Sequence, residues 1–238
     1  MHDCRTCINL DTWMCYTCLN NNDLDLGDHY ERATPELVAE REAEERKRIE
    51  EPLCQEVMQL KLDPAFIETF NKCKRFTSNN MPKYVPVEAR ERSLVSTNAY
   101  ALCELYCDVP EELKGKNIVK IEGESVYLAV RLPNVVPDKE LKILPDDIDG
   151  FFQHKNSITN PDLSKIAKTI TIEDDKYVDI NVLNQKVTIS ADFLNAALDI
   201  LGKDIATLGF TGECGNVVLM TPLGRIAISP VVNSPPSR

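Results

Sequence analysis

The stretch that most constrains the fold is residues 186–232, KVTISADFLNAALDILGKDIATLGFTGECGNVVLMTPLGRIAISPVV, because its pattern changes from strand to helix and back. Val187 and Ile189 alternate with polar residues as a half-buried strand does, and Ser190 can cap the helix that follows. Gly202 ends that helix, and turn residues then separate three short strands: Ile205–Phe210, Val217–Met220 and Arg225–Val231. The pattern predicts one helix on a small antiparallel sheet, with these residues on its buried face: Phe193, Leu194, Ala197, Leu198 and Leu201.

This β-α-β-β-β order resembles the repeating half-domain of the beta-type DNA sliding clamps, above all their last repeat. The resemblance is carried by the helix FLNAALDIL, the strand that ends near FTG, the strand NVVLMTP and the apolar-Pro-apolar ending Ala227–Val231. It covers this one stretch and includes no catalytic motif. It implies a clamp-like α+β domain, whereas the pattern by itself also fits any small α+β domain with one amphipathic helix on a sheet.

A second, more diverged copy is predicted earlier in the chain. Thr97–Cys107 has helical spacing, and Asn117–Ile121 and Ser125–Leu132 alternate as the two strands of a hairpin. We therefore expect two copies of the repeat, Ser93–Leu144 and Pro161–Val232. Two repeats make one clamp domain, and the clamp family closes its ring with six such domains. The resemblance therefore implies a ring only if this chain forms a homo-oligomer.

Leu132–Asn160, which is Pro-rich and then polar, is expected to be an insertion between the copies. Pro161-Asp162 resembles the phrase that leads into a strand in the clamps, and Thr169–Ile172 is the strand expected here.

The composition indicates a globular protein without generic attraction to polyanions. The chain has 238 residues, 43% of them hydrophobic, and a formal net charge of −11. It has no apolar run near the roughly 20 residues of a membrane span and no signal-peptide pattern. We expect a cytoplasmic protein without membrane contact.

Four of the nine cysteines form two CxxC pairs near the start: Cys4, Cys7, Cys15 and Cys18. Two facing CxxC turns supply the four thiolates that a structural Zn²⁺ ion needs, and complete Cys₄ ligation leaves no open catalytic position. The alternatives are a redox-active pair or a disordered thiol-rich tail. A stretch this short has no core of its own, so the metal would supply most of its ordering free energy.

Three regions are predicted: a zinc knuckle (1–20), a linker and helical segment (21–92) and a clamp-like α+β domain (93–238). In the middle region, Thr34-Pro35 can begin a charged helix through Glu51, and Asp63-Pro64 can begin a second one. The first is typical of a solvated face, with a spacer or coiled-coil arm as the alternative.

A basic segment, Lys72–Arg92, ends the middle region, and Phe76 and Tyr84 lie among its bases. A flexible basic segment with aromatic side chains can follow a phosphate backbone and stack on bases, and it can equally be a solvated linker. The candidate nucleic-acid contacts are Lys72, Lys74, Arg75, Lys83, Arg90 and Arg92. The two expected clamp helices, in contrast, are neutral to acidic on their solvent faces, so neither should hold DNA.

The sequence contains no signature of catalysis. Its three histidines are far apart, and it has no phosphate-binding loop, GxSxG, HExxH or dinucleotide fingerprint. Asp146, Asp147 and Asp149 lack the remaining spacing of a calcium loop and are expected to form an acidic turn. Two non-enzymatic hypotheses follow: a DNA-replication accessory protein of the kind that phages or mobile elements encode, or a protein-interaction module on a clamp-like scaffold without DNA binding.

The double CxxC spacing predicts one zinc ion per chain. Metal analysis of the purified protein should give stoichiometric zinc, and the double variant Cys4→Ser, Cys7→Ser should lose it because half of the ligands are gone. Absence of zinc from the wild-type protein, or its full retention by the variant, would contradict the prediction.

Overall fold

The computed structural model describes residues 34–53, 56–78, 81–130, 144, 147–154, 156–172, 175–182, 185–202, 204–210 and 215–231. The chain divides into two compact units, Met1–Glu51 and Pro52–Arg238. The predicted zinc ligands lie outside the described residues. The second unit begins far before the boundary at residue 93 that the sequence suggested, and strands on the two sides of that boundary pair with each other.

Helix α2 (Pro35–Leu53) begins where the sequence predicts it. The Thr34 hydroxyl accepts a hydrogen bond from the Leu37 backbone N–H at 3.3 Å, and Pro35 occupies the first helical position. No helix among the described residues is long and apolar enough to span a membrane.

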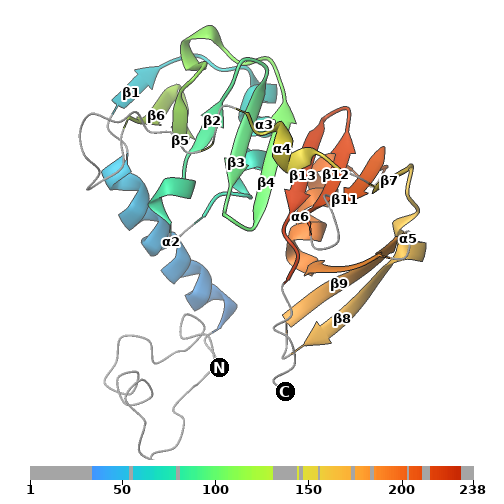
Figure 1. Ribbon diagram of the computed structural model, residues 1–238. Coiled ribbons are helices and arrows are strands. Elements are labelled where there is room, and N and C mark those ends of the chain that lie inside the picture. The colour runs from blue at the N-terminus through green and yellow to red at the C-terminus, as the bar shows by residue number, and fades with distance from the viewer. Residues whose placement is uncertain are drawn as a thin grey trace, which may run out of the picture. The chain divides into compact units, whose positions relative to one another are not determined.

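Within the described residues the second unit is mostly β-structure, with one sheet of ten strands and another of three (Figure 1). The larger sheet has the order β1-β6-β5-β2-β3-β4-β13-β12-β11-β7 and the smaller one β10-β9-β8. The strands are β1 (Glu56–Gln59), β2 (Val87–Ala89), β3 (Ser93–Thr97), β4 (Ala101–Tyr106), β5 (Asn117–Glu122), β6 (Ser125–Ala129), β7 (Asn156–Thr159), β8 (Ala167–Ile172), β9 (Asp175–Val182), β10 (Gln185–Ser190), β11 (Thr207–Phe210), β12 (Val217–Thr221) and β13 (Gly224–Ile228). The helices are α3 (Pro64–Lys74), α4 (Asp149–Phe152), α5 (Leu163–Ile166) and α6 (Ala191–Leu201), with short 3₁₀ turns at Pro82–Tyr84 and Glu111–Leu113.

The element order β-α-β-β-β occurs twice, as β1-α3-β2-β3-β4 and as β10-α6-β11-β12-β13. In each copy the three strands after the helix form an antiparallel meander, and one further strand extends it: β5 beside β2, and β7 beside β11. The two meanders meet through β4 and β13, which pair antiparallel with Cys103 opposite Ile226. We call this β4–β13 pair the junction.

The junction has two differently covered faces because side chains alternate along each strand. Cys103, Leu105 and Ile226 belong to the large core with α3 and α6. Leu102 and Ala227 point to the opposite face and belong to a smaller core. We call the first side the helical face and the second the outer face of the sheet.

Gly224 begins β13 at a close approach of the β13 backbone to β4. A Cβ atom at this position would lie 2.3 Å from the Glu104 carbonyl oxygen and 2.9 Å from the Leu105 Cα, and its φ of 157° is one that L side chains rarely adopt. Glycine is therefore required for the close approach of β13 to β4.

The predicted first repeat is wrong in its elements. Thr97–Cys107 is not a helix: it holds the end of β3, a turn and β4, and the Asn98 side chain accepts backbone hydrogen bonds from Tyr100 and Ala101. The true helix of the first copy is α3, which the Asp63-Pro64 signal located correctly; the Asp63 carboxylate accepts from the Ala65 N–H at 2.7 Å. Short apolar runs fit both the helical spacing and the alternation of a strand, and in this segment the chain forms strands.

The last repeat follows the sequence prediction closely. Helix α6 ends at Gly202, which has φ of 85°, and β11, β12 and β13 occupy the three predicted strand regions. The buried face differs in phase from the prediction: Leu194, Ala197 and Leu201 are buried, but Phe193 and Leu198 are half-buried. Ile200, which the sequence analysis left out, is also buried.

Two other predictions have mixed outcomes. The hairpin of β5 and β6 is confirmed, with Gly123 in the turn at φ of 61°, and the strand predicted at Thr169–Ile172 is part of β8. The expected insertion between the copies is in part structural, because β7 lies within it and pairs with β11.

We expect Leu194→Ala to lower the free energy of unfolding by about 2–5 kcal/mol, because Leu194 is only 4% exposed and its removal leaves a cavity under α6. The adjacent Asn195 is exposed, so Asn195→Ala should change stability by less than about 0.5 kcal/mol. Urea denaturation of both variants measures the difference, and equal losses would contradict the helical phase.

Candidate functional site

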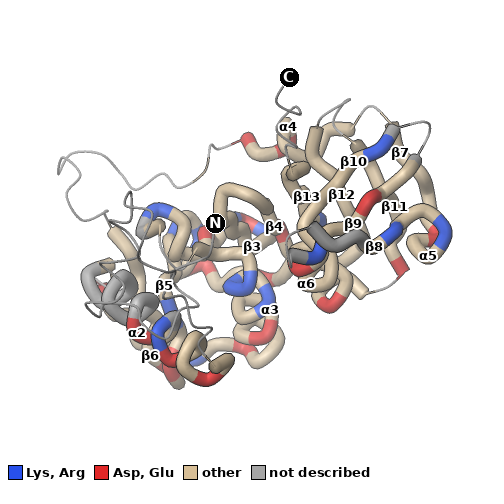
Figure 2. The backbone as a smooth tube through the Cα atoms, turned by 90° about the horizontal axis from the view of Figure 1, so that it is seen from below, with Lys and Arg blue, Asp and Glu red and all other residues tan. Residues whose placement is uncertain are grey.

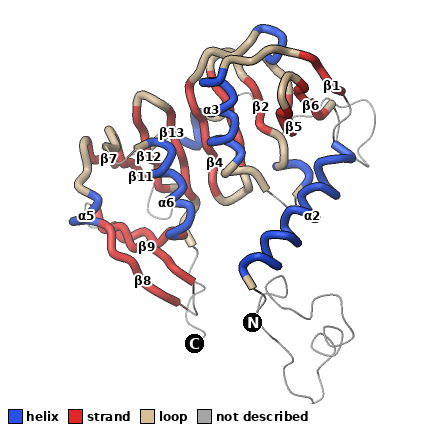
Figure 3. Tube along the Cα trace, turned by 180° about the vertical axis from the view of Figure 1, so that it is seen from behind, coloured by secondary structure: helices blue, strands red, loops and turns tan. Residues whose placement is uncertain are grey.

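Helices α3 and α6 lie on the same side of the ten-stranded sheet, one in each repeat (Figure 3). Their solvent sides form a polar surface that we call the helix surface. Its members are Glu68, Asn71, Lys72 and Arg75 from α3 and its C-cap, and Asp192, Asn195 and Asp199 from α6. Among the described residues two bases face three acids, so this part of the surface carries no excess of positive charge.

Both bases of the helix surface are paired with acids of the same surface. Lys72 Nζ lies 2.7 Å from Glu68 Oε1, and Arg75 Nη2 lies 3.2 Å from Asp199 Oδ2, which links α3 to α6. The hydrogen bond and the charge of Lys72 lower the pKa of Glu68. Exposed pairs of this kind contribute little stability, but they balance each cation locally. Figure 2 shows both acidic and basic positions on α3, whereas α6 carries acids and no base.

The six bases predicted to contact nucleic acid do not form one flexible strip. Lys72, Lys74 and Arg75 end α3, Lys83 lies in a 3₁₀ turn, and Arg90 and Arg92 flank the turn from β2 to β3. The interpretation of this segment as a flexible linker is therefore wrong for the described residues. Bases at the end of α3 also interact favourably with the negative end of the helix dipole, which explains three of them without a ligand.

Several of these bases have partners within the protein. Lys74 Nζ donates to the Val85 carbonyl at 3.3 Å, and Arg90 Nε lies 2.9 Å from Glu88 Oε1. The Lys83 ammonium lies 5.4 Å from the centroid of the Tyr84 ring. Phe76, expected to offer a stacking face, is fully buried. The aromatic part of the predicted interface is thus largely used by the fold.

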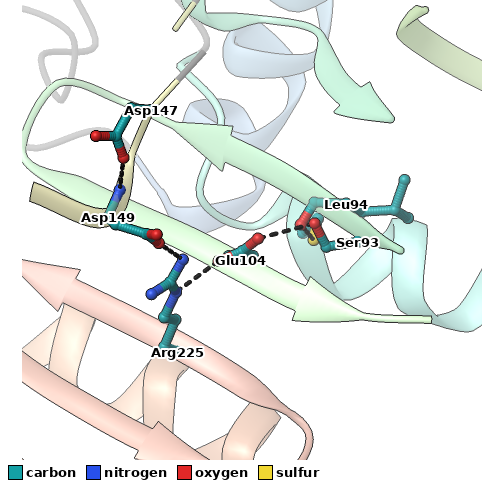
Figure 4. A network of polar contacts seen from close by, with 7 residues as sticks. Ser93, Leu94, Glu104, Asp147, Asp149 and Arg225 are labelled. Carbon is teal, nitrogen blue, oxygen red and sulfur yellow. Dashed lines mark hydrogen bonds and ion pairs between the residues drawn. The ribbon is translucent and has the colours of Figure 1, made fainter. Parts of the chain in front are cut away.

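The acidic turn contributes a polar network on the outer face. Asp147 accepts a hydrogen bond from the Asp149 N–H at 2.9 Å, and Asp149 Oδ1 pairs with Arg225 Nη2 at 2.5 Å (Figure 4). Arg225 Nε also pairs with Glu104 Oε2 at 2.5 Å, and Glu104 accepts from the Ser93 hydroxyl at 2.8 Å. Asp146 lies outside the described residues.

Arg225 and Glu104 are directly opposite each other across the junction. Burial opposes the charge of Arg225, but hydrogen bonds to Asp149 and Glu104 outweigh it, and the pKa of Arg225 is raised. The sequence analysis did not identify this pair. The available signal was a single charged residue in each of two otherwise apolar strands.

The cysteines of the described residues do not offer a metal or redox centre. Cys73 and Cys103 are fully buried, and burial raises the pKa of Cys73 well above its usual value. Burial likewise raises the pKa of the half-buried Cys107 to about 11, so at neutral pH its thiol is protonated and a poor ligand. No cluster of three or more metal-ligating side chains occurs in the part of the chain that the structure describes.

No family model and no curated protein matches this sequence. Among solved structures, the DNA polymerase sliding clamp of Bacillus subtilis aligns with a TM-score of 0.46 and 13% identity, over 76% of this chain and 66% of that one. The DNA polymerase III subunit beta of Pseudomonas aeruginosa aligns with a TM-score of 0.46 and 9% identity, over 72% of this chain and 64% of that one. The Helicobacter pylori beta clamp, bound to a DNA ligase peptide, aligns with a TM-score of 0.42 and 12% identity, over 74% of this chain and 65% of that one. The chain thus matches slightly less than two thirds of the length of each clamp.

Proposed function

We propose that this chain is a non-enzymatic, clamp-like scaffold of the DNA-replication machinery that works through protein contacts and does not hold DNA by its helices. The observation that carries the proposal is the helix surface. In the sliding clamps that the sequence resembles, the repeat helices present bases to DNA; here the bases of the helix surface are paired with acids of the same surface, which supports the proposal. A phosphate-binding surface needs cations without such partners, because counterion release is the main sequence-independent attraction to DNA.

The other regions have supporting roles in this proposal. A zinc knuckle at Cys4, Cys7, Cys15 and Cys18 would be a rigid docking head, since a closed Cys₄ site has no catalytic position. The net charge of −11 favours basic protein surfaces over polyanions as partners. Ring formation, if it belongs to this protein, requires several copies.

The DNA-replication accessory with direct DNA contact is the second candidate, because Lys72, Lys74 and Arg75 cluster at the end of α3. In this case the triple variant Lys72→Ala, Lys74→Ala, Arg75→Ala should weaken DNA binding uniformly across sequences. It should flatten the salt slope by up to roughly 3, about one unit for each phosphate that the variant no longer neutralises.

A salt titration of duplex-DNA binding distinguishes the two candidates. We expect the wild-type protein to show no steep salt-dependent binding at low ionic strength. The double variant Asp192→Lys, Asp199→Lys exchanges two acids of the helix surface for bases and should create such binding, with a slope of roughly −2 or steeper. Asn195→Gln, on the same surface, is the matched neutral control.

Steep salt-dependent binding by the wild-type protein, abolished by the triple alanine variant, would overturn the protein-only proposal in favour of the second candidate. Light scattering tests the assembly separately. A molar mass near the 26.8 kDa of one chain at working concentrations would contradict a closed ring.

A further inference from the structure

A short segment crosses the outer face of the junction, and we call it the strap: Leu144 together with residues 147–154, which include α4. Ile148 and Phe152 are each only 3% exposed, and Leu144 is 9% exposed. These three side chains belong to one core with residues from both repeats: Val95, Leu102, Val218 and Ala227. The strap therefore covers an apolar surface to which both repeats contribute.

Arg225 holds the strap in two ways. Its guanidinium pairs with Asp149 and lies 4.2 Å from the centroid of the Phe152 ring. The same guanidinium is tied to the sheet through Glu104 (Figure 4). Asp149 is 68% exposed at its side chain, so water can replace it at Arg225 at low cost.

The end of the strap lies flat against β11. A Cβ atom on Gly209 would be 2.6 Å from Cγ of His154, so the imidazole occupies the space that a side chain at position 209 would fill. This contact is independent of Arg225 and places a second fixed point on the second repeat.

The strap itself has little structure of its own. Helix α4 is four residues long, and its N-cap residue, Ile148, makes no side-chain capping bond. The Phe151 and Gln153 backbone N–H groups donate hydrogen bonds to the backbone carbonyls of Ile148 and Asp149, which also belong to the strap. Side chains therefore provide the contacts that hold it on the sheet: three apolar anchors, one acid and one imidazole.

These side-chain contacts are of the kind that a bound peptide makes, and we propose that the strap is an exchangeable internal ligand of the outer face. The partner that replaces it is a peptide segment of the same chemistry: an aliphatic residue, an acid directly after it, and a phenylalanine three residues after the acid. The aliphatic and aromatic side chains take the places of Ile148 and Phe152, and the acid pairs with Arg225. This inference names one partner surface of the proposed scaffold and so rests on that proposal.

The experiment uses the full chain and a fluorescently labelled synthetic peptide of residues 144–154. In the double variant Ile148→Ser, Phe152→Ser the strap loses its two most buried apolar anchors, and we expect it to leave the outer face free. Fluorescence anisotropy should show the peptide binding this variant, and binding the wild-type chain at least about tenfold more weakly, because the wild-type surface is occupied. A peptide with lysine in place of the acid should bind neither protein.

A milder variant keeps the inference testable if the double variant does not fold. Asp149→Ala removes only an exposed partner of Arg225, so the core is unchanged. Amide hydrogen exchange at Phe151 and Gln153 should accelerate while exchange in β4 and β13 stays the same, and peptide binding should be intermediate.

Equal peptide affinity for the wild-type chain and the folded double variant would overturn the inference, as would no binding to that variant. Unchanged exchange at Phe151 and Gln153 in Asp149→Ala would also overturn it. None of these results depends on DNA, so failure here and failure of the proposed function are distinguishable.

Discussion

The pairing of β4 with β13 is the interaction on which the rest of the structure depends. These strands are far apart in sequence, and each is the last strand of its repeat. Their antiparallel pairing turns two separate meanders into one sheet and places α3 and α6 on its same side. It also creates the outer face, because Leu102 and Ala227 become neighbours only when the strands pair. The helix surface and the strap site are thus consequences of one strand pair.

The register of this pair is specified by charge as well as by apolar alternation. Arg225 and Glu104 are opposite each other on the outer face, and both are nearly buried. A slip of one residue would turn Arg225 toward the helical core and separate it from Glu104. Removing Arg225 would leave the buried carboxylate of Glu104 without its cation, which is unfavourable. The close approach of Gly224 to the Glu104 backbone restrains the same register by sterics.

Sequence reasoning succeeded where the information was local and failed where it was not. Gly202 and the turns between the last three strands mark their own positions, so the second repeat was predictable element by element. In the first repeat, the Asp63-Pro64 signal found α3, but the apolar spacing in Thr97–Cys107 fitted a helix too, and the repeat was assigned to the wrong elements. The junction depends on a partner more than 100 residues away, so no local pattern reveals it.

Because the end of α3 is a helix and not a flexible segment, the bases there have fixed acidic partners. As a flexible segment, Lys72 and Arg75 would be free to follow a phosphate backbone; as part of α3, they face Glu68 and Asp199 across fixed distances. The placement of α3 and α6 on one side of the sheet therefore provides no attraction to DNA by itself, because such attraction needs bases without acidic partners. The outer face shows the opposite chemistry, an apolar patch with one partly buried guanidinium, which suits an acidic, apolar peptide better than a polyanion. The proposed peptide site thus lies on the side of the sheet away from the helices.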